Sequence, residues 1–161
     1  MNEDVRLAFT IRPARAGDEG DIVALLRELA AFEELQVEFH LDEAAVTRDL
    51  FGGAAQCELL LRGDEAVGIA VWFWSYRSFR AARGVYVEDL YVSPACRGQG
   101  GGRLLLAHLA RTARDAGGYM EWRALDWNKP ARDFYEGLGA VAVAEWIGYR
   151  LQGDALERLC T

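Results

Sequence analysis

A run of seven residues near the middle of the chain combines glycines with two arginines. The run, called the glycine loop below, is Arg97, Gly98, Gln99, Gly100, Gly101, Gly102 and Arg103. Glycines let backbone N–H groups come close to a bound anion. The residues that follow have the periodicity of an amphipathic helix, whose first turn offers unpaired N–H groups and the positive end of the helix dipole. The run therefore predicts a site for a ligand that carries phosphate.

Two common phosphate-binding motifs do not fit the glycine loop. A P-loop requires Lys-Ser or Lys-Thr after its last glycine, and the dinucleotide fingerprint Gly-x-Gly-x-x-Gly requires a glycine at Arg103 or Leu105. The pattern that fits is Arg/Gln-x-x-Gly-x-Gly/Ala, through Arg97, Gly100 and Gly102. Taken alone, the loop is also compatible with glycines that only turn the chain or cap a helix.

A second motif lies later in the chain, in residues 126–139. Asn128 stands where a predicted strand gives way to a predicted helix that begins with Pro130 and Ala131 and contains Tyr135 beside Phe134. Asn128 can cap that helix, or it can form hydrogen bonds with amide groups of a ligand. A tyrosine beside a phenylalanine is commonly part of a core. Near a departing anion, however, a phenol can donate a proton.

In this order, the two motifs resemble the two walls of the cofactor site in the GNAT superfamily of N-acetyltransferases. Similarity to the diamine acetyltransferases, and in particular to the thialysine N-acetyltransferases, extends over nearly the whole chain, through residues 26–33, 86–92, 125–128 and 151–154. The resemblance implies an α/β fold of three layers. In it a mixed, mostly antiparallel sheet is flanked by helices, and its central strands splay to form an acetyl-CoA cleft. The implied reaction is direct attack of a primary amine on acetyl-CoA in a ternary complex.

The resemblance also implies roles for individual residues. The backbone N–H of Leu90 polarises the acetyl carbonyl, as an oxyanion hole does, and Tyr135 protonates the departing thiolate. An alkylammonium must lose a proton before it attacks; Glu88 accepts that proton through water, while Asp89 and Glu33 help to bind the cation. The expected cofactor contacts are Leu90, Tyr91, Val92, the glycine loop from Arg97 to Arg103, Asn128, Pro130, Ala131 and Tyr135.

The substrate prediction depends on two further observations. Glu88 and Asp89 are neighbours on a predicted strand, where adjacent side chains point to opposite faces. We therefore expect only one of them to face the substrate, and we choose Glu88. Arg77 and Phe79 stand where polyamine enzymes tend to have an acid and a tryptophan. Because an arginine repels a polycation and binds a carboxylate, a thialysine-like or lysine-like amine is favoured. The alternatives are a polyamine acetyltransferase, a protein N-acetyltransferase and a non-catalytic acetyl-CoA-binding module.

Composition limits the class of protein and its partners. A chain of 161 residues fits a single domain, 1–161, with an ordered core of about 6–155. A net charge of −7 disfavours nucleic acid and suits a cationic substrate, although solubility alone also favours such acidity. Without an apolar span or a signal peptide, we expect a cytoplasmic protein with no membrane partner. The resemblance implies a homodimer. We expect reduced thiols and no metal site, because Cys57, Cys96 and Cys160 form no Cys-x-x-Cys pair and the two histidines are far apart.

The elements that would position these residues follow from hydrophobic periodicity and turn signals. Strands are expected at 9–13, 57–61, 66–76, 84–92, 119–125 and 147–151, and helices at 18–32, from Asp42 to before Gly52, after the glycine loop, and at 130–138. The helix after the glycine loop is expected to bury Leu104, Leu105, Leu109, Ala110 and Ala113. This order of strands and helices is typical of a three-layer α/β domain.

Overall fold

The computed structural model describes residues 9–160. The chain divides into two compact units, of which the first ends at Arg123 and the second begins at Ala124. The single domain over 1–161 stays a prediction. Its expected ordered core begins at residue 6, but residues 6–8 lie outside the described residues. The N-terminal segment, which we expect to contain no signal peptide, lies outside them too. Among the helices of the described part, none is long and apolar enough to cross a membrane.

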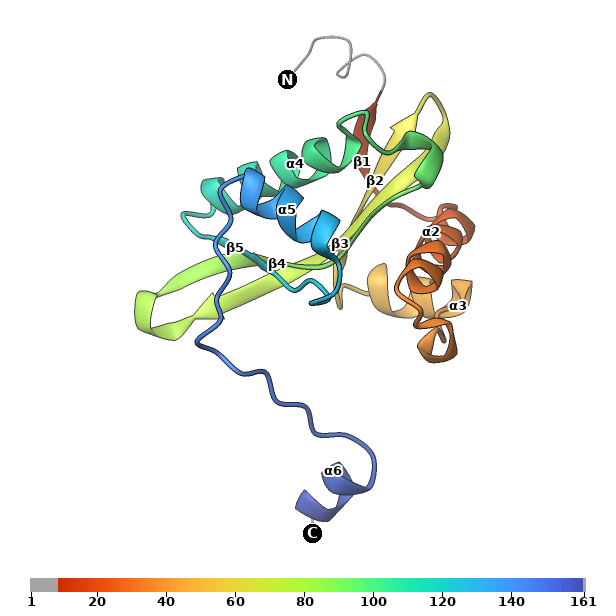
Figure 1. The fold of residues 1–161 in the computed structure, drawn as a ribbon. Helices are drawn as coiled ribbons and strands as arrows, with labels where there is room; N and C mark the ends of the chain where they lie inside the picture. The colour runs from red at the N-terminus through yellow and green to blue at the C-terminus, as the bar shows by residue number, and fades with distance from the viewer. Residues whose placement is uncertain (1–8, 161) are drawn as a thin grey trace. The chain divides into compact units, whose positions relative to one another are not determined.

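The first unit is built on a five-stranded sheet with the order β1-β2-β3-β4-β5 (Figure 1). The strands are β1 (Thr10–Pro13), β2 (Gln56–Arg62), β3 (Glu65–Arg77), β4 (Ala82–Val92) and β5 (Met120–Trp122). The first four are antiparallel neighbours, and β5 runs parallel to β4. Antiparallel strands can be joined by tight turns, whereas the parallel pair requires a crossover. Helix α4 (Gly101–Asp115) provides that crossover.

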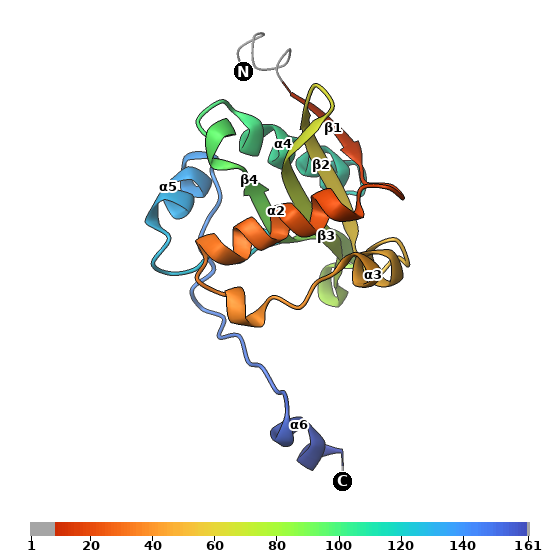
Figure 2. The same ribbon diagram turned by 90° about the vertical axis from the view of Figure 1, so that its right-hand side faces the viewer.

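Helices cover both faces of this sheet, as Figures 1 and 2 show. One face carries α2 (Glu19–Phe32), α3 (Glu43–Ala45) and the π-helical turn η2 (Val46–Leu50). The other face carries α4. Each interface has its own core of buried side chains, one beneath α2 around Ile22, Leu59 and Ile69, and one beneath α4 around Leu60, Leu105 and Leu109. The expectation of a mixed sheet between two helical layers is confirmed.

Short helical turns complete the first unit. They are η1 (Gln36–Glu38), η3 (Ser78–Arg80) and η4 (Pro94–Cys96). The turn η3 joins β3 to β4 at the tip of the longest hairpin, so the expected loop there is short. The helix expected from Asp42 has that residue as its N-terminal cap, because Asp42 Oδ1 accepts a hydrogen bond of 2.7 Å from the N–H of Ala45.

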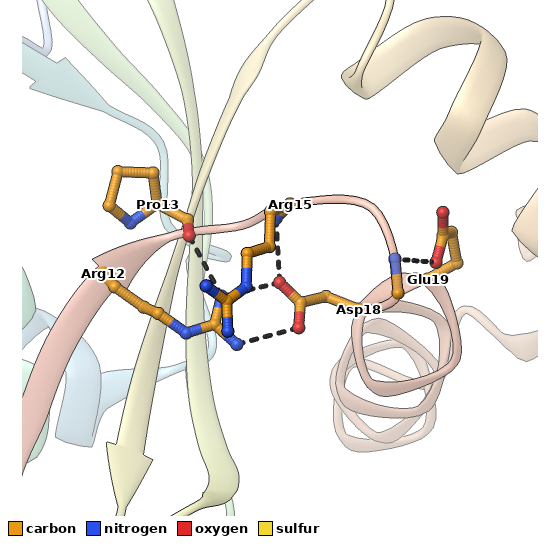
Figure 3. Close-up of polar contacts among 6 residues, drawn as sticks. Arg12, Pro13, Arg15, Asp18 and Glu19 are labelled. Atoms are coloured by element: carbon orange, nitrogen blue, oxygen red, sulfur yellow. Dashed lines mark hydrogen bonds and ion pairs between the residues drawn. The ribbon is translucent and has the colours of Figure 1, made fainter.

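The start of α2 is fixed to β1 by a carboxylate (Figure 3). Asp18 accepts two hydrogen bonds from the Arg12 guanidinium, at 2.6 and 2.8 Å, and one from the N–H of Arg15 at 2.8 Å. These bonds hold the pKa of Asp18 below its usual range. A bidentate Arg–carboxylate pair fixes orientation as well as distance. Helix α2 therefore begins at a defined position relative to the sheet, which matters because its last turn reaches the candidate site.

The periodicity of α4 was predicted almost correctly. Leu105, Leu109 and Ala113 are buried, one helical turn apart. Leu104 is only partly buried and Ala110 is exposed, whereas Leu106, which was not expected in the core, is buried. The buried face of the helix is centred on residues 105, 109 and 113. Residue 106 lies at the margin of that face, and residue 110 lies outside it.

The second unit contains α5 (Lys129–Gly137) and α6 (Asp154–Leu159). The predicted helix 130–138 is confirmed within one residue at each end, whereas α6 was not predicted. The predicted strand 147–151 is wrong: this described segment has no regular secondary structure. A strand requires hydrogen bonds from a neighbouring strand, and the described part of the second unit contains none. The segment has strand-like residues without a partner.

Candidate active site

The acidic pair on β4 lies at a β-bulge. Val71 of β3 is opposite Asp89, and the next residue, Trp72, is opposite Val87. Glu88 is therefore the additional residue of β4. A bulge interrupts the alternation of side chains and redirects them. We expected only one of the two acids to face the substrate because side chains alternate between the faces of a regular strand. The bulge shows that this argument does not apply at Glu88 and Asp89.

The bulge also changes the side of β4 to which the backbone N–H groups point. Before the bulge, the N–H of Val85 donates to the carbonyl of Tyr119, just before β5, and after it, the N–H of Ser93 donates to the carbonyl of Val67, near the start of β3. N–H groups alternate sides along a strand, so those of Leu90 and Val92 point away from β3. The register between β4 and β5 covers only Val85–Val87. The N–H groups of Leu90 and Val92 therefore lie along an open edge, where they can bind a ligand.

Two further acids lie close enough to the carboxyl group of Asp89 to affect its pKa. Burial, and to a smaller extent the charges of Glu88 and Glu33, together raise the pKa of Asp89 to about 6. Glu33 follows the last residue of α2, and burial raises the pKa of its own carboxyl group. Groups that repel one another in this way favour a bound cation, because its positive charge relieves the repulsion. We call Glu33, Glu88 and Asp89 the acidic cluster.

The glycine loop has the backbone geometry that its sequence predicts. Gly98 and Gly100 have φ angles of 72° and 86°, in the left-handed region that favours glycine. Helix α4 begins at Gly101, and its first intrahelical hydrogen bond is donated by Leu104 to the carbonyl of Gly100, at 3.0 Å. The N–H groups of Gly101, Gly102 and Arg103 precede that bond and point along the helix axis, which is the arrangement that binds phosphate.

Gly101 has a second function that the motif does not reveal. A Cβ atom at this position would lie 2.6 Å from Cδ2 of Leu60. Gly101 therefore lets the first turn of α4 pack closely on β2. The sequence alone gives no signal for this requirement, because Leu60 is distant along the chain.

Side chains hold the loop on both sides. Arg97 Nε donates to the carbonyl of Val92 at 2.8 Å, and Gln99 Oε1 accepts from Arg62 at 2.9 Å. Arg62 lies at the end of β2, and sequence reasoning missed it because nothing in a local pattern connects it to the loop. The second hydrogen bond of Gln99, to the carbonyl of Ala95 at 3.1 Å, closes the turn before α4.

Arg77 lies at the end of β3, near the tip of the hairpin. Its guanidinium forms an ion pair with Glu121 and lies 3.9 Å from the centre of the Tyr119 ring. Phe79, on the tip itself, is fully exposed. The substrate contact of Arg77 stays a prediction. For that contact, Arg77 would have to bind the substrate's carboxylate either together with Glu121 or in place of Glu121.

The second unit holds the other predicted residues. Asn128 Oδ1 accepts a hydrogen bond of 3.3 Å from the N–H of Ala131 at the start of α5, so the capping interpretation of Asn128 is confirmed. Pro130 lies in the first turn, where the missing N–H is not needed. Tyr135 lies near the end of α5, with its ring centre 5.5 Å from that of Phe134. The roles of Asn128, Pro130, Ala131 and Tyr135 toward a cofactor stay predictions.

The cysteines are separate from one another. Cys57 and Cys96 are buried free thiols, and Cys160 is an exposed one. Burial raises the pKa of Cys57 to about 12, which keeps this thiol protonated and unreactive. Within residues 9–160, no group of three or more His, Cys, Asp or Glu side chains is arranged to hold a metal ion.

Comparisons with known proteins identify relatives of this chain. The model of the Acetyltransferase (GNAT) family matches residues 22–140. The chain is 36% identical to a thialysine N-epsilon-acetyltransferase of Bos taurus, with 95% of this chain and 98% of that protein covered. It is 42% identical over 93 residues to an L-ornithine N5-acetyltransferase of Arabidopsis thaliana, which covers 57% of this chain and 41% of that protein.

Solved structures show the same fold at low sequence identity. A ribosomal-protein-alanine N-acetyltransferase from Brucella melitensis biovar Abortus 2308 superposes with a TM-score of 0.73 at 21% identity, covering 91% of this chain and 100% of that one. An integron cassette protein from the mobile metagenome of V. cholerae superposes with a TM-score of 0.79 at 24% identity, covering 95% and 98%. These likenesses concern the fold.

Proposed function

Because the chain belongs to the Acetyltransferase (GNAT) family and is an acetyltransferase that acts on amines, we propose that it transfers the acetyl group of acetyl-CoA to the side-chain amine of a lysine-like amino acid. The observation that carries the proposal is the acidic cluster beside the bulged edge of β4. The same strand leads through Val92 to the glycine loop. One continuous segment thus offers carboxylates for a cation, N–H groups for a carbonyl and N–H groups for a pyrophosphate.

The proposed mechanism is direct attack of the amine on the thioester. Asp89 and Glu33 hold the ammonium group, and Glu88 accepts its proton through water. The amine nitrogen then forms a bond to the acetyl carbon while the N–H of Leu90 stabilises the negative carbonyl oxygen. The carbon–sulfur bond breaks, Tyr135 protonates the thiolate, and the acetylated nitrogen loses its second proton, which restores the phenol of Tyr135. The products are the acetylated amine and CoA.

The cofactor would be bound mostly by backbone groups. The N–H groups of the glycine loop, including those of Gly98 and Gly102, would hold the pyrophosphate, and Arg103 would add positive charge. Tyr91 and Val92 would line the pantetheine arm. Asn128, whose carboxamide oxygen caps α5, retains its NH2 group as a donor for an amide of that arm.

Two observations support an amino acid over a polyamine as the substrate. Relatives that the chain resembles are named for thialysine and ornithine, which both carry a carboxylate besides the side-chain amine. Arg77 and its exposed neighbour Phe79 give the hairpin tip no negative charge for a second ammonium group. A polyamine needs such a partner at each end, whereas a lysine analogue does not.

A panel of amines tests this proposal. Values of kcat/KM for thialysine, lysine, ornithine, putrescine and spermidine should be highest for one of the three amino acids. Higher values for spermidine or putrescine would favour the polyamine alternative, and acetylation of peptides alone would favour a protein N-acetyltransferase. If the protein binds acetyl-CoA in a calorimeter but releases no thiol with any acceptor, it is a non-catalytic module.

We also propose that the protein is a cytoplasmic homodimer without a membrane or nucleic-acid partner. The net charge of −7 supports the absence of a nucleic-acid partner.

A further inference from the structure

Glu28 connects α2 to the end of β4. Its Oε2 atom accepts a hydrogen bond from the hydroxyl of Tyr91 at 3.0 Å and another from the hydroxyl of Ser93 at 3.0 Å. Tyr91 is a buried member of the core beneath α2. Burial and the bond to Glu28 raise the pKa of the Tyr91 phenol, so this hydroxyl remains protonated and donates. One carboxylate oxygen therefore holds two donors that flank Val92.

The same face of α2 also contacts the first residue of the glycine loop. Phe32 lies one helical turn after Glu28, on the same side of the helix. The Arg97 guanidinium lies 4.9 Å from the centre of the Phe32 ring and 5.3 Å from that of Tyr91, and its Nε donates to Val92. Glu28 and Phe32 thus secure one short segment, from Tyr91 to Arg97, against the helix.

This segment needs support from outside the sheet. Beyond Val87, the register of β4 with β5 ends, so Leu90 to Val92 are paired through β3. The glycines that follow have a large conformational freedom, which costs entropy when a ligand orders them. A side-chain anchor that orders the segment in advance lowers that cost and raises affinity.

We propose that Glu28 is a positioning residue for acetyl-CoA, which holds Tyr91 and Ser93, and through them Val92 and Arg97, in the geometry that the cofactor binds. The inference rests on the proposed function, because that function assigns this segment to the cofactor. In this proposal Glu28 acts through its bonds to Tyr91 and Ser93 and not through a contact with the reacting atoms. It acts as a hydrogen-bond acceptor, and its charge is not required.

The test compares two substitutions of Glu28. Glu28→Ala removes the acceptor for both hydroxyl groups and should weaken CoA binding and raise the KM for acetyl-CoA by about three- to tenfold, the range expected for hydrogen bonds of this kind. The kcat at saturating acetyl-CoA should stay within about twofold, because no interaction made only in the transition state is lost. Glu28→Gln should stay close to the wild type, because both hydrogen bonds converge on one oxygen and the carboxamide retains an oxygen acceptor.

Two further variants make the result specific. Asp21→Ala removes a carboxylate from the first turn of the same helix and should leave CoA affinity unchanged. Ser93→Ala removes one of the two donors without altering α2, and should weaken CoA binding less than Glu28→Ala. It keeps the test available if Glu28→Ala does not fold, which thermal melting of each variant reveals.

Isothermal titration with CoA, which needs no turnover, gives the deciding measurement. Weaker binding in Glu28→Ala, or in Ser93→Ala if Glu28→Ala does not fold, together with wild-type binding in Glu28→Gln and Asp21→Ala, supports the inference. Unchanged binding in Glu28→Ala overturns it, and so does a Glu28→Gln variant as weak as Glu28→Ala. A wild type that binds CoA but acetylates no amine contradicts the proposed function alone. A wild type that binds no CoA overturns both.

Discussion

The surroundings of Asp89 disfavour the ionised form of its carboxyl group. Burial and the neighbouring charges of Glu88 and Glu33 raise its pKa from 3.8 to about 6. At about 1.4 kcal/mol for each pKa unit, an ionised Asp89 costs the folded state about 3 kcal/mol at neutral pH. Perturbed carboxyl groups of this kind gather at functional sites. Binding of an ammonium group to the acidic cluster would recover part of this free energy.

The pH dependence of the reaction should report this carboxyl group. An acid with a raised pKa is ionised only above that pKa, so the cluster loses negative charge as the pH falls through about 6. We expect kcat/KM for the amine to decrease below this pH by up to about tenfold per pH unit. Asp89→Asn should lower kcat/KM at pH 8 and abolish this decrease near pH 6. A profile that is the same in Asp89→Asn and in the wild type would assign the titration to another group.

Tyr135 is the residue whose proposed role depends most on resemblance. Tyr135→Phe removes the phenolic proton but keeps the ring that packs near Phe134. If the hydroxyl protonates the thiolate, kcat should decrease by about 100-fold, the lower end of the range for general acid catalysis, while the KM for acetyl-CoA changes little. Steady-state kinetics at saturating amine measure both kcat and the KM for acetyl-CoA. An unchanged kcat, under conditions where chemistry limits turnover, would remove Tyr135 from the mechanism.

At the scale of elements, periodicity predicted what lies within a helix or strand and missed what interrupts it. The ranges of α2, α4, β2 and β3 follow from apolar spacing and turn residues, and the structure confirms them. The bulge at Glu88 could not be predicted, because a bulge is defined by two strands in register. For the same reason, the direction of the Leu90 N–H group follows only from the pairing of β4 with its neighbours.

The contact between β2 and α4 contains a buried acid with no catalytic role. Glu58 is buried among side chains beneath α4, and its Oε2 has no hydrogen-bond partner within the described residues. Burial raises its pKa, and His108, whose Nε2 lies 3.7 Å away, opposes this effect. Because the folded state holds this proton more tightly than the unfolded state, Glu58 contributes stability at low pH that is lost as the pH rises through the folded-state pKa.

Glu58→Gln should therefore stabilise the protein in a pH-dependent way. The variant cannot ionise, so its Tm at pH 8 should exceed that of the wild type by about 2–4 °C, which corresponds to about 1 kcal/mol. At pH 4, where Glu58 is protonated in both states, the difference should disappear. Calorimetry at both pH values measures this, with Glu65→Gln as an exposed control on the same hairpin. A gain at pH 4 equal to that at pH 8 would show that packing and not charge is responsible.

At the scale of the whole molecule, the sequence predicted the class of reaction better than it predicted the tertiary contacts. The two motifs identified the family because they are local patterns of residue type and spacing. The contacts of Glu28 and Arg62 and the packing role of Gly101 were missed, because each involves residues that are distant along the chain. Such tertiary contacts leave no periodic signal. The strand expected at 147–151 failed for the same reason, since β-branched and aromatic residues indicate a strand but cannot provide its partner.

That segment gives a prediction about assembly. Residues of the second unit carry exposed apolar side chains, among them Val141, Trp146, Ile147 and Tyr149, with exposed fractions of 84%, 79%, 75% and 92%. Exposed apolar groups at this density mark surfaces that another chain covers. The proposed homodimer would cover them and would also offer a partner for the unpaired backbone.

We therefore expect light scattering after size exclusion to give twice the monomer mass, and the double variant Trp146→Ser/Tyr149→Ser to shift the protein toward the monomer. Val37→Ser is the matched control, because Val37 is 91% exposed but belongs to the first unit. Dimers dissociate on dilution by mass action, so the variant should show its largest effect at low concentration. If the wild type is a monomer at every concentration, or if Val37→Ser dissociates the dimer as readily, then the segment around Trp146 is not the interface. Its apolar residues would then need an explanation within one copy of the chain.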